Sequence, residues 1–162
     1  MRPFRSKKRW SAAVVGIAVI GIFAAVALGS MPFNFTPTTL VTGNLVNRID
    51  ANHNGVKFQT SHPIDVRVQK IVIAPGGYSG WHHHPGIVIA AVESGAVTFT
   101  KADCSSKTYG PGLATGSVFV ESDDEPGQAS SADGATLYAT FYAPHAVPPV
   151  FRIEDTPPRH CK

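Results

Sequence analysis

Ala74–Gly86 reads APGGYSGWHHHPG and carries the signal that decides the fold. Its three consecutive histidines, His82, His83 and His84, follow a Pro-Gly-Gly turn. Because residues i and i+2 of a strand point to the same face, we expect His82 and His84 to enter one space and His83 to point away from it. Two imidazoles on one face form half of a transition-metal site. The alternative is a surface histidine cluster that binds nothing.

The chain on both sides of this segment has the pattern of an all-β protein. Turn residues recur about every 8–12 residues, and no helical period appears after residue 30, which is typical of a sandwich or barrel. A continuous apolar run predicts a strand over residues 86–91 that is buried on both sides. A short extended segment is expected at 151–154 within an otherwise irregular, proline-rich tail. Further strands are predicted over residues 65–73, 96–100, 116–121 and 135–142.

The N-terminus has the composition of an export signal. Residues 12–29 are uncharged and mostly apolar, and five basic residues lie in the first ten positions. A helix over this run would be about 27 Å long, close to the thickness of a bilayer core. The basic flank should stay in the cytoplasm, which directs the remaining chain outward. We therefore expect either an anchor in the cytoplasmic membrane with the domain outside, or a signal peptide cleaved near Ala27-Leu28-Gly29 and a secreted domain.

This pattern divides the chain into three parts. Residues 1–30 are the predicted signal peptide or transmembrane helix, and residues 31–44 are the predicted linker. Residues 45–162 are the predicted barrel with its proline-rich tail.

Charge excludes one class of partner. The sequence has 14 Lys and Arg residues against 11 Asp and Glu residues, and five of the basic ones are Arg2, Arg5, Lys7, Lys8 and Arg9. The remaining nine basic residues and all 11 acidic ones give residues 11–162 a formal charge of −2. A slightly acidic domain lacks the basic surface that nucleic-acid binding requires, so we expect no nucleic-acid partner.

The two cysteines fit an exported protein. Cys104 lies in a polar segment and Cys161 is the second-last residue. An even pair outside the cytoplasm most simply forms a disulfide, which would attach the C-terminal tail to the barrel. Two unpaired thiols are the alternative.

The histidine segment resembles the first motif of the cupin superfamily, in which a glycine precedes His-x-His and a glutamate and a second glycine follow. The glutamate position of that motif falls on Val88 (or Ile89), so this ligand is missing. The residues that match are Gly76, His82, His84 and Gly95. In the second cupin motif, Gly116 matches the start, Gln128 occupies the histidine position and Ala132 occupies the asparagine position.

Small exported bacterial cupins show a closer resemblance, which covers roughly residues 45–161. They share a turn before the histidines, a loop cysteine after an aspartate, a strand that begins with glycine, and a C-terminal segment that ends in cysteine. The corresponding segments here are Ala74–Gly77, Gly80–Gly86, Asp103–Cys104, Gly116–Val120 and Arg152–Glu154 with Cys161.

The resemblance implies a single cupin (jelly-roll-like) β-barrel behind the N-terminal helix. It implies a divalent metal (Fe, Mn, Ni, Cu or Zn) on His82, His84 and Gln128, with a small-molecule ligand in the barrel mouth. If Gln128 is a ligand, Gln128→His should raise metal affinity at least about tenfold, because imidazole is the better donor.

Several alternatives stay open at this stage. The barrel is either a binding protein, a metal-dependent dioxygenase or isomerase, or a metal-free interaction scaffold, and the sequence indicates no catalytic residue. A homodimer is one alternative for its assembly. The acidic run at positions 121–125 is expected to be a solvated loop, the alternative being a carboxylate at the pocket rim.

Overall fold

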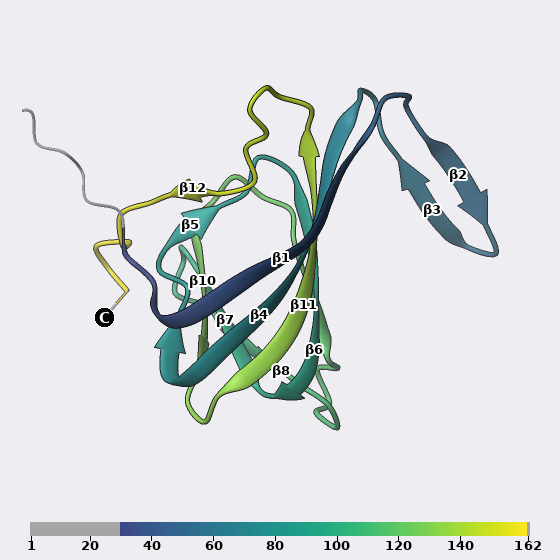
Figure 1. The fold of residues 1–162 in the computed structure, drawn as a ribbon. Helices are drawn as coiled ribbons and strands as arrows, with labels where there is room; N and C mark the ends of the chain where they lie inside the picture. The colour runs from purple at the N-terminus through teal and green to yellow at the C-terminus, as the bar shows by residue number, and fades with distance from the viewer. Residues whose placement is uncertain (1–29, 162) are drawn as a thin grey trace, which may run out of the picture.

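A computed structural model describes residues 30–161, and in this part of the chain all regular structure is β (Figure 1). No helix within residues 30–161 is long enough and apolar enough to cross a membrane. The helix predicted over residues 12–29 lies outside the described residues. The strands are β1 (Phe33–Leu45), β2 (Asp50–His53), β3 (Val56–Gln59), β4 (Ile64–Tyr78), β5 (His82–His83), β6 (Ile87–Gly95), β7 (Val97–Lys101), β8 (Ser106–Tyr109), β9 (Val118–Glu121), β10 (Gly127–Ser131), β11 (Ala135–Pro144) and β12 (Ile153–Glu154).

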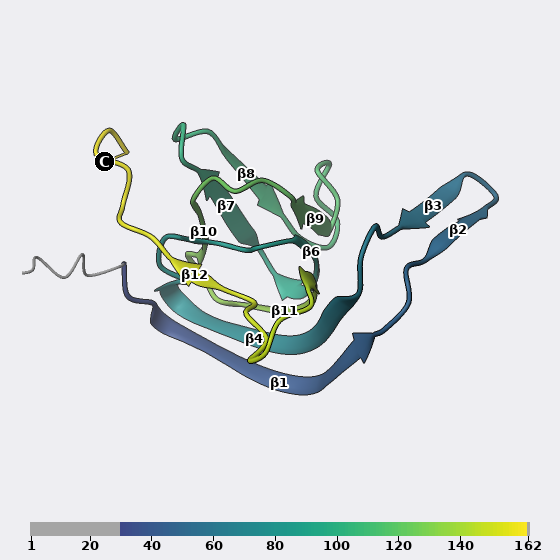
Figure 2. The same cartoon turned by 90° about the horizontal axis from the view of Figure 1, so that it is seen from above.

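The long strand β4 organises an antiparallel barrel. It pairs with β1 along one edge and with β11 along the other, and the ladder continues through β6 to β9. The end of β4 also pairs with β10, which connects to β5 and β7, and β7 pairs with β8. Seen from above, these strands curve around a common interior, and the C-terminal tail with β12 crosses one end (Figure 2).

Strand alternation builds the core inside this barrel. Along β11 the buried side chains alternate with half-exposed ones, and the buried set includes Leu137 and Phe141. The strand β6 alternates as well: Val88 is 2% exposed, whereas Ile87 and Ile89 are 47% and 39% exposed. The prediction of a strand buried on both faces is therefore wrong. One face of β6 covers the core and the other faces out, as is common in antiparallel sheets.

The predicted linker over residues 31–44 is wrong, because β1 belongs to the barrel. Its ladder with β4 runs from Phe33 opposite Tyr78 to Leu45 opposite Ile64. The segment is rich in threonine, which favours strands. Its proline at position 37 is tolerated because, among the described strands, β1 pairs with β4 alone and so lies at an edge. The barrel therefore begins at Phe33 rather than at residue 45.

The hairpin β2–β3 projects away from the barrel (Figures 1 and 2). Its turn is Asn54-Gly55, and both residues have positive φ, 48° and 82°. Two consecutive positive φ angles define the type I′ turn that matches the twist of a two-residue hairpin.

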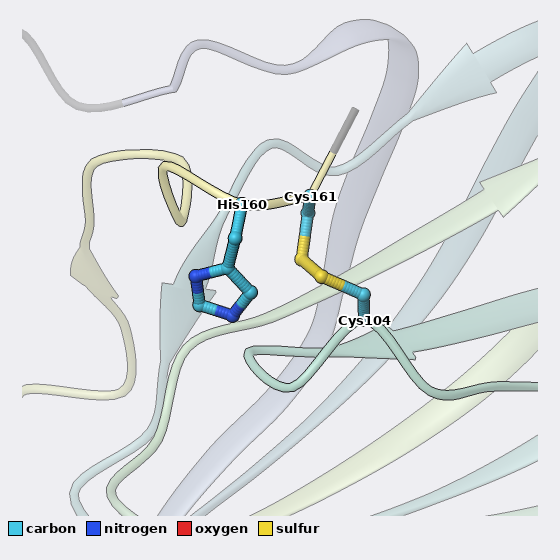
Figure 3. A group of neighbouring side chains, drawn as sticks. All are labelled: Cys104, His160 and Cys161. Atoms are coloured by element: carbon cyan, nitrogen blue, oxygen red, sulfur yellow. A yellow bond between two sulfur atoms is a disulfide. The ribbon is translucent and has the colours of Figure 1, made fainter.

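A disulfide attaches the C-terminal tail to the loop after β7. Cys104 and Cys161 are bonded, with their Cα atoms 5.3 Å apart (Figure 3). The predicted pairing is confirmed. His160 lies beside the bridge, but this group is no thiolate metal site because both sulfur atoms are consumed in the disulfide. Before reaching the bridge, the tail pairs β12 with β5, and the Asp155 amide donates to the Trp81 carbonyl.

Candidate metal centre

A cavity of about 190 Å³ occupies the barrel interior. Its wall is mostly apolar and comes from β1, β4, β5, β6, β9, β10, β11 and the tail. The polar and charged side chains that reach it are Arg67, Gln69, Ser79, His82, His84, Glu121 and Arg152. Pro32, Phe35 and Pro37 also line it, so the segment expected to be a linker forms part of the wall.

Strand alternation places the three histidines as predicted. His82 and His84 are 5% and 6% exposed and line the cavity, and their rings lie edge to face with centroids 4.8 Å apart. His83 points the other way and bonds through Nδ1 to the Asp155 carboxylate at 2.7 Å. The two cavity histidines therefore form a pair, and the middle one contacts the tail.

Backbone carbonyls determine which ring nitrogen of each cavity histidine is free. His82 Nδ1 lies 2.9 Å from the Gly80 carbonyl oxygen, and His84 Nδ1 contacts the Phe151 carbonyl oxygen. A carbonyl only accepts, so each Nδ1 carries the proton and donates. Each Nε2 then keeps its lone pair for a metal, the arrangement that outer hydrogen bonds give to metal-binding histidines.

Gly80 makes this local geometry accessible. Its φ is +71°, and a Cβ at this position would lie 2.0 Å from the Ser30 carbonyl oxygen. Any side chain would meet both the backbone strain and this contact, so glycine is required two residues before His82.

Both imidazoles are neutral near pH 7. Burial lowers the pKa of His82 to about 3, and the charge of Arg152 reinforces this effect. Burial likewise lowers the pKa of His84 to about 4, although its hydrogen bond to Phe151 acts in the opposite direction. Neutral imidazole is the form that binds metals, so both side chains are ready to act as ligands without first losing a proton.

Glu121 supplies a third donor at the same point. Its Oε2 lies 3.6 Å from His84 Nε2, and the ligand atoms of Glu121, His82 and His84 all lie within 4.8 Å of one another. Burial, opposed by Arg152 and reinforced by Asp123, raises the pKa of the Glu121 carboxyl to about 7. A buried carboxylate without a compensating cation is disfavoured, and a bound divalent cation would reverse that penalty.

The register of β6 and β9 explains why the cupin motif did not identify Glu121, which the sequence offered only as an alternative within the acidic run. The cupin motif places its glutamate at the position that is Val88 here, and Glu121 is the residue directly opposite Val88 in the β6–β9 ladder. The carboxylate thus reaches the same part of the cavity from the neighbouring strand. Only the first residue of the acidic run enters the cavity; the following ones include Asp123, which pairs with Lys101 at 3.0 Å on the surface. The pairing of β6 with β9 is the signal that a linear motif does not contain.

Gln128 does not join the two histidines. It lies on β10, where Gly127, Ala129 and Ser131 are buried and the intervening residues are half-buried. Ala129 lines the cavity and Gln128 does not, because neighbouring strand residues point to opposite faces. The motif alignment therefore placed the candidate ligand on β10, but at a residue that does not face the cavity, one position before the inward-facing Ala129.

This placement changes the expected effect of Gln128→His. We expect its metal affinity to stay within about twofold of wild type, a difference of roughly 0.4 kcal/mol, because the new imidazole would lie on the outer face. Competition titration of both proteins with a chromogenic chelator measures the ratio. A tenfold gain would show that position 128 reaches the metal after all.

The donor set fits a divalent transition metal. Two imidazole nitrogens and one carboxylate oxygen on one side of a cavity leave coordination positions open on the other, as in sites that bind iron(II), and they also suit manganese or zinc. The apolar wall around them limits access of water and strengthens local electrostatic interactions.

Comparisons with known proteins add little beyond the architecture. No protein-family model matches the sequence, and no curated protein matches it. Solved structures with a similar arrangement include a conserved protein of unknown function from Streptococcus pyogenes, at 17% identity and a TM-score of 0.44, covering 65% of this chain and 75% of that chain. The antiparallel barrel of this chain, with the His-x-His pair in its interior, is consistent with a cupin fold.

Two further structures are enzymes that are longer than this chain. A structure of DMSP lyases matches at 18% identity and a TM-score of 0.48, covering 75% of this chain and 53% of that chain. A salicylate 1,2-dioxygenase from Pseudoaminobacter salicylatoxidans matches at 16% identity and a TM-score of 0.40, covering 46% and 19%. The chain thus spans about half of the first and about a fifth of the second.

Proposed function

We propose that this protein is a cupin-like barrel that binds one divalent transition metal through His82, His84 and Glu121 and takes a small molecule beside it. The observation that supports this most strongly is the convergence of donor atoms from two buried histidines and the partly buried Glu121 within 4.8 Å, in a cavity with a mostly apolar wall. A site that served only stability would more simply be filled with apolar side chains.

The protein's own groups would prepare this site. The Gly80 and Phe151 carbonyls hold both Nε2 lone pairs toward the cavity, and Phe141 packs edge-on against His84 with ring centroids 5.2 Å apart. A bound metal would supply Lewis acidity and orient a ligand. Iron, manganese, nickel, copper and zinc are all compatible with nitrogen and oxygen donors.

The coordination positions that the three donors leave open also support an enzymatic version of this proposal, a metal-dependent dioxygenase or isomerase. A metal held by His82, His84 and Glu121 would supply Lewis acidity to a substrate in those positions. The metal content of purified protein distinguishes the alternatives. Stoichiometric iron or manganese favours the enzyme, and one ion of another metal favours a metal-binding protein. Metal-free protein that cannot be loaded would contradict the proposed function and favour a scaffold.

Metal affinity should depend on pH through Glu121 alone. Below pH 7 the metal must displace the Glu121 proton, so affinity should rise about tenfold per pH unit from pH 5 to pH 7 and then level off. The histidines do not contribute in this range, because their pKa values of about 3 and about 4 leave them neutral. Calorimetric titration with zinc chloride across this range measures the slope.

Glu121→Gln is the matched variant for this measurement. It should bind zinc more weakly and show no slope between pH 5 and pH 7. A slope that persists in Glu121→Gln would assign the displaced proton to another group.

We also propose that the barrel works outside the cytoplasm, either anchored to the cytoplasmic membrane or secreted. The Cys104–Cys161 disulfide supports this, because such bridges persist in oxidising compartments. The apolar run at residues 12–29 supports it independently. Cell fractionation followed by non-reducing peptide mapping tests it. Cytoplasmic protein with two free thiols would contradict it.

A further inference from the structure

We propose that the cavity takes a small carboxylate ligand with a compact apolar body, and that Arg67 binds the carboxylate. This names the ligand class for the cavity of the proposed function, but it does not require the metal. Arg67 lies on β4 and lines the cavity together with Gln69 and Ile71, its neighbours on the same strand face.

The two cavity arginines differ in how their charge is compensated. Arg152 donates to both carboxylate oxygens of Glu154 and to the Ser79 carbonyl oxygen at 2.6 Å, so its fork is occupied. Arg67 makes one long side-chain hydrogen bond, from Nε to the Thr42 hydroxyl at 3.4 Å. Among residues 30–161, no carboxylate lies within ion-pair distance of Arg67.

The Phe151 ring holds the Arg67 guanidinium in place while leaving its donors other than Nε free. The guanidinium carbon lies 4.1 Å from the centre of the Phe151 ring. Stacking on an aromatic face uses the plane of the guanidinium and leaves the N–H groups at its edge available. A planar fork with free N–H groups matches a carboxylate, which it can bind with two parallel hydrogen bonds.

The Phe141 ring connects Arg67 to the candidate metal centre. It is directly opposite Phe141 in the β4–β11 ladder, and the Phe141 ring packs against His84. A ligand held by Arg67 would therefore extend along Phe141 toward the histidines. The cavity of about 190 Å³ is smaller than the roughly 300–1,000 Å³ of pockets for drug-sized ligands, which limits the ligand to a small acid.

The apolar wall specifies the remainder of the ligand. Leu137, Phe119 and Val88 line the same cavity as Arg67 and the metal-binding residues. These side chains offer no hydrogen bond, so a ligand with many hydroxyl groups would lose solvation without compensation. An aromatic or short aliphatic monocarboxylate meets both requirements.

Benzoate and its neutral isostere benzamide test this proposal. Ligand-detected NMR titrations use the full-length protein, once after treatment with a chelator and once with one equivalent of zinc. Metal-free wild type should bind benzoate at least about tenfold more tightly than benzamide. Arg67→Met should weaken benzoate binding at least about tenfold and leave benzamide binding unchanged. Arg67→Lys, which keeps the charge and the stem, should weaken benzoate binding less.

Lys70→Met is the matched control. Lys70 lies on the same strand with its amine 5.9 Å from the Tyr138 ring, and it does not line the cavity. It should not affect benzoate binding. Equal affinity for the two probes, no binding of either, or equal weakening by Arg67→Met and Lys70→Met would overturn the proposal. Benzoate binding that depends on Arg67 in a protein that binds no metal would support this inference and contradict the proposed function alone.

Discussion

His82→Ala and His84→Ala should each reduce metal affinity by at least about 100-fold, whereas His83→Ala should change it by less than about threefold. Loss of an outer partner of a metal ligand typically costs 10–100-fold in affinity, and loss of a ligand itself should exceed that range. His82 and His84 face the cavity with Glu121, and His83 contacts Asp155 outside it.

His83→Ala is a close control because it removes the same side chain from the adjacent position. Elemental analysis of the three purified variants measures retained metal, and competition titration with a chromogenic chelator measures affinity. Circular dichroism confirms that each variant keeps its β structure. Equal losses at all three positions would contradict the assignment of the ligands by strand alternation.

Replacement of both Cys104 and Cys161 by serine should destabilise the barrel by about 4 kcal/mol. The bridge closes a loop with a sequence separation of 57 residues, for which the chain-entropy relation gives about 4 kcal/mol at 25 °C, within the usual 2–5 kcal/mol for a lost native disulfide. A loss of that size should lower Tm by more than about 8 °C.

The same change should affect the cavity, because the tail supplies part of its wall. Phe151 and Arg152 line the cavity, and the Phe151 carbonyl oxygen accepts a hydrogen bond from His84 Nδ1.

Urea unfolding of wild type and the double serine variant, each with and without reductant, measures the loss of stability. Reduced wild type should match the variant, and reductant should not affect the variant. A difference below about 1 kcal/mol would show that β12 and its contacts hold the tail without the bridge.

The strands and the histidine pair were predictable because they depend on local alternation. The segments predicted at 65–73, 96–100, 116–121 and 135–142 correspond to β4, β7, β9 and β11. A strand period of two also predicted that His82 and His84 share a face. The cysteine pairing followed from having two cysteines in a chain that is predicted to be exported.

Local pattern was less informative where only one face of a strand is buried. The apolar run at residues 86–91 indicates a strand, but it does not show that Ile87 and Ile89 face outward, because that depends on whether another layer covers the sheet. The segment predicted as a linker, residues 31–44, has no charge and two prolines, which suit a linker and an edge strand equally. Its pairing with β4 decided between them.

The sequence by itself therefore determined the all-β structure of the part described here, residues 30–161, a disulfide between the two cysteines, and two histidines on one strand face, because each depends on residue type and local spacing. Only the tertiary structure decided the third donor of the candidate metal centre and the free arginine beside it. Glu121 reaches the cavity because β9 pairs with β6 and sets it opposite Val88, and Gln128 is excluded by the face that β10 turns inward. Arg67 is available because no carboxylate among residues 30–161 lies within ion-pair distance of it, whereas Arg152 pairs with Glu154. These relations join residues that are 33 to 84 positions apart, as from Val88 to Glu121 and from Arg67 to Phe151. They are created by the ladder register and by the path of the tail.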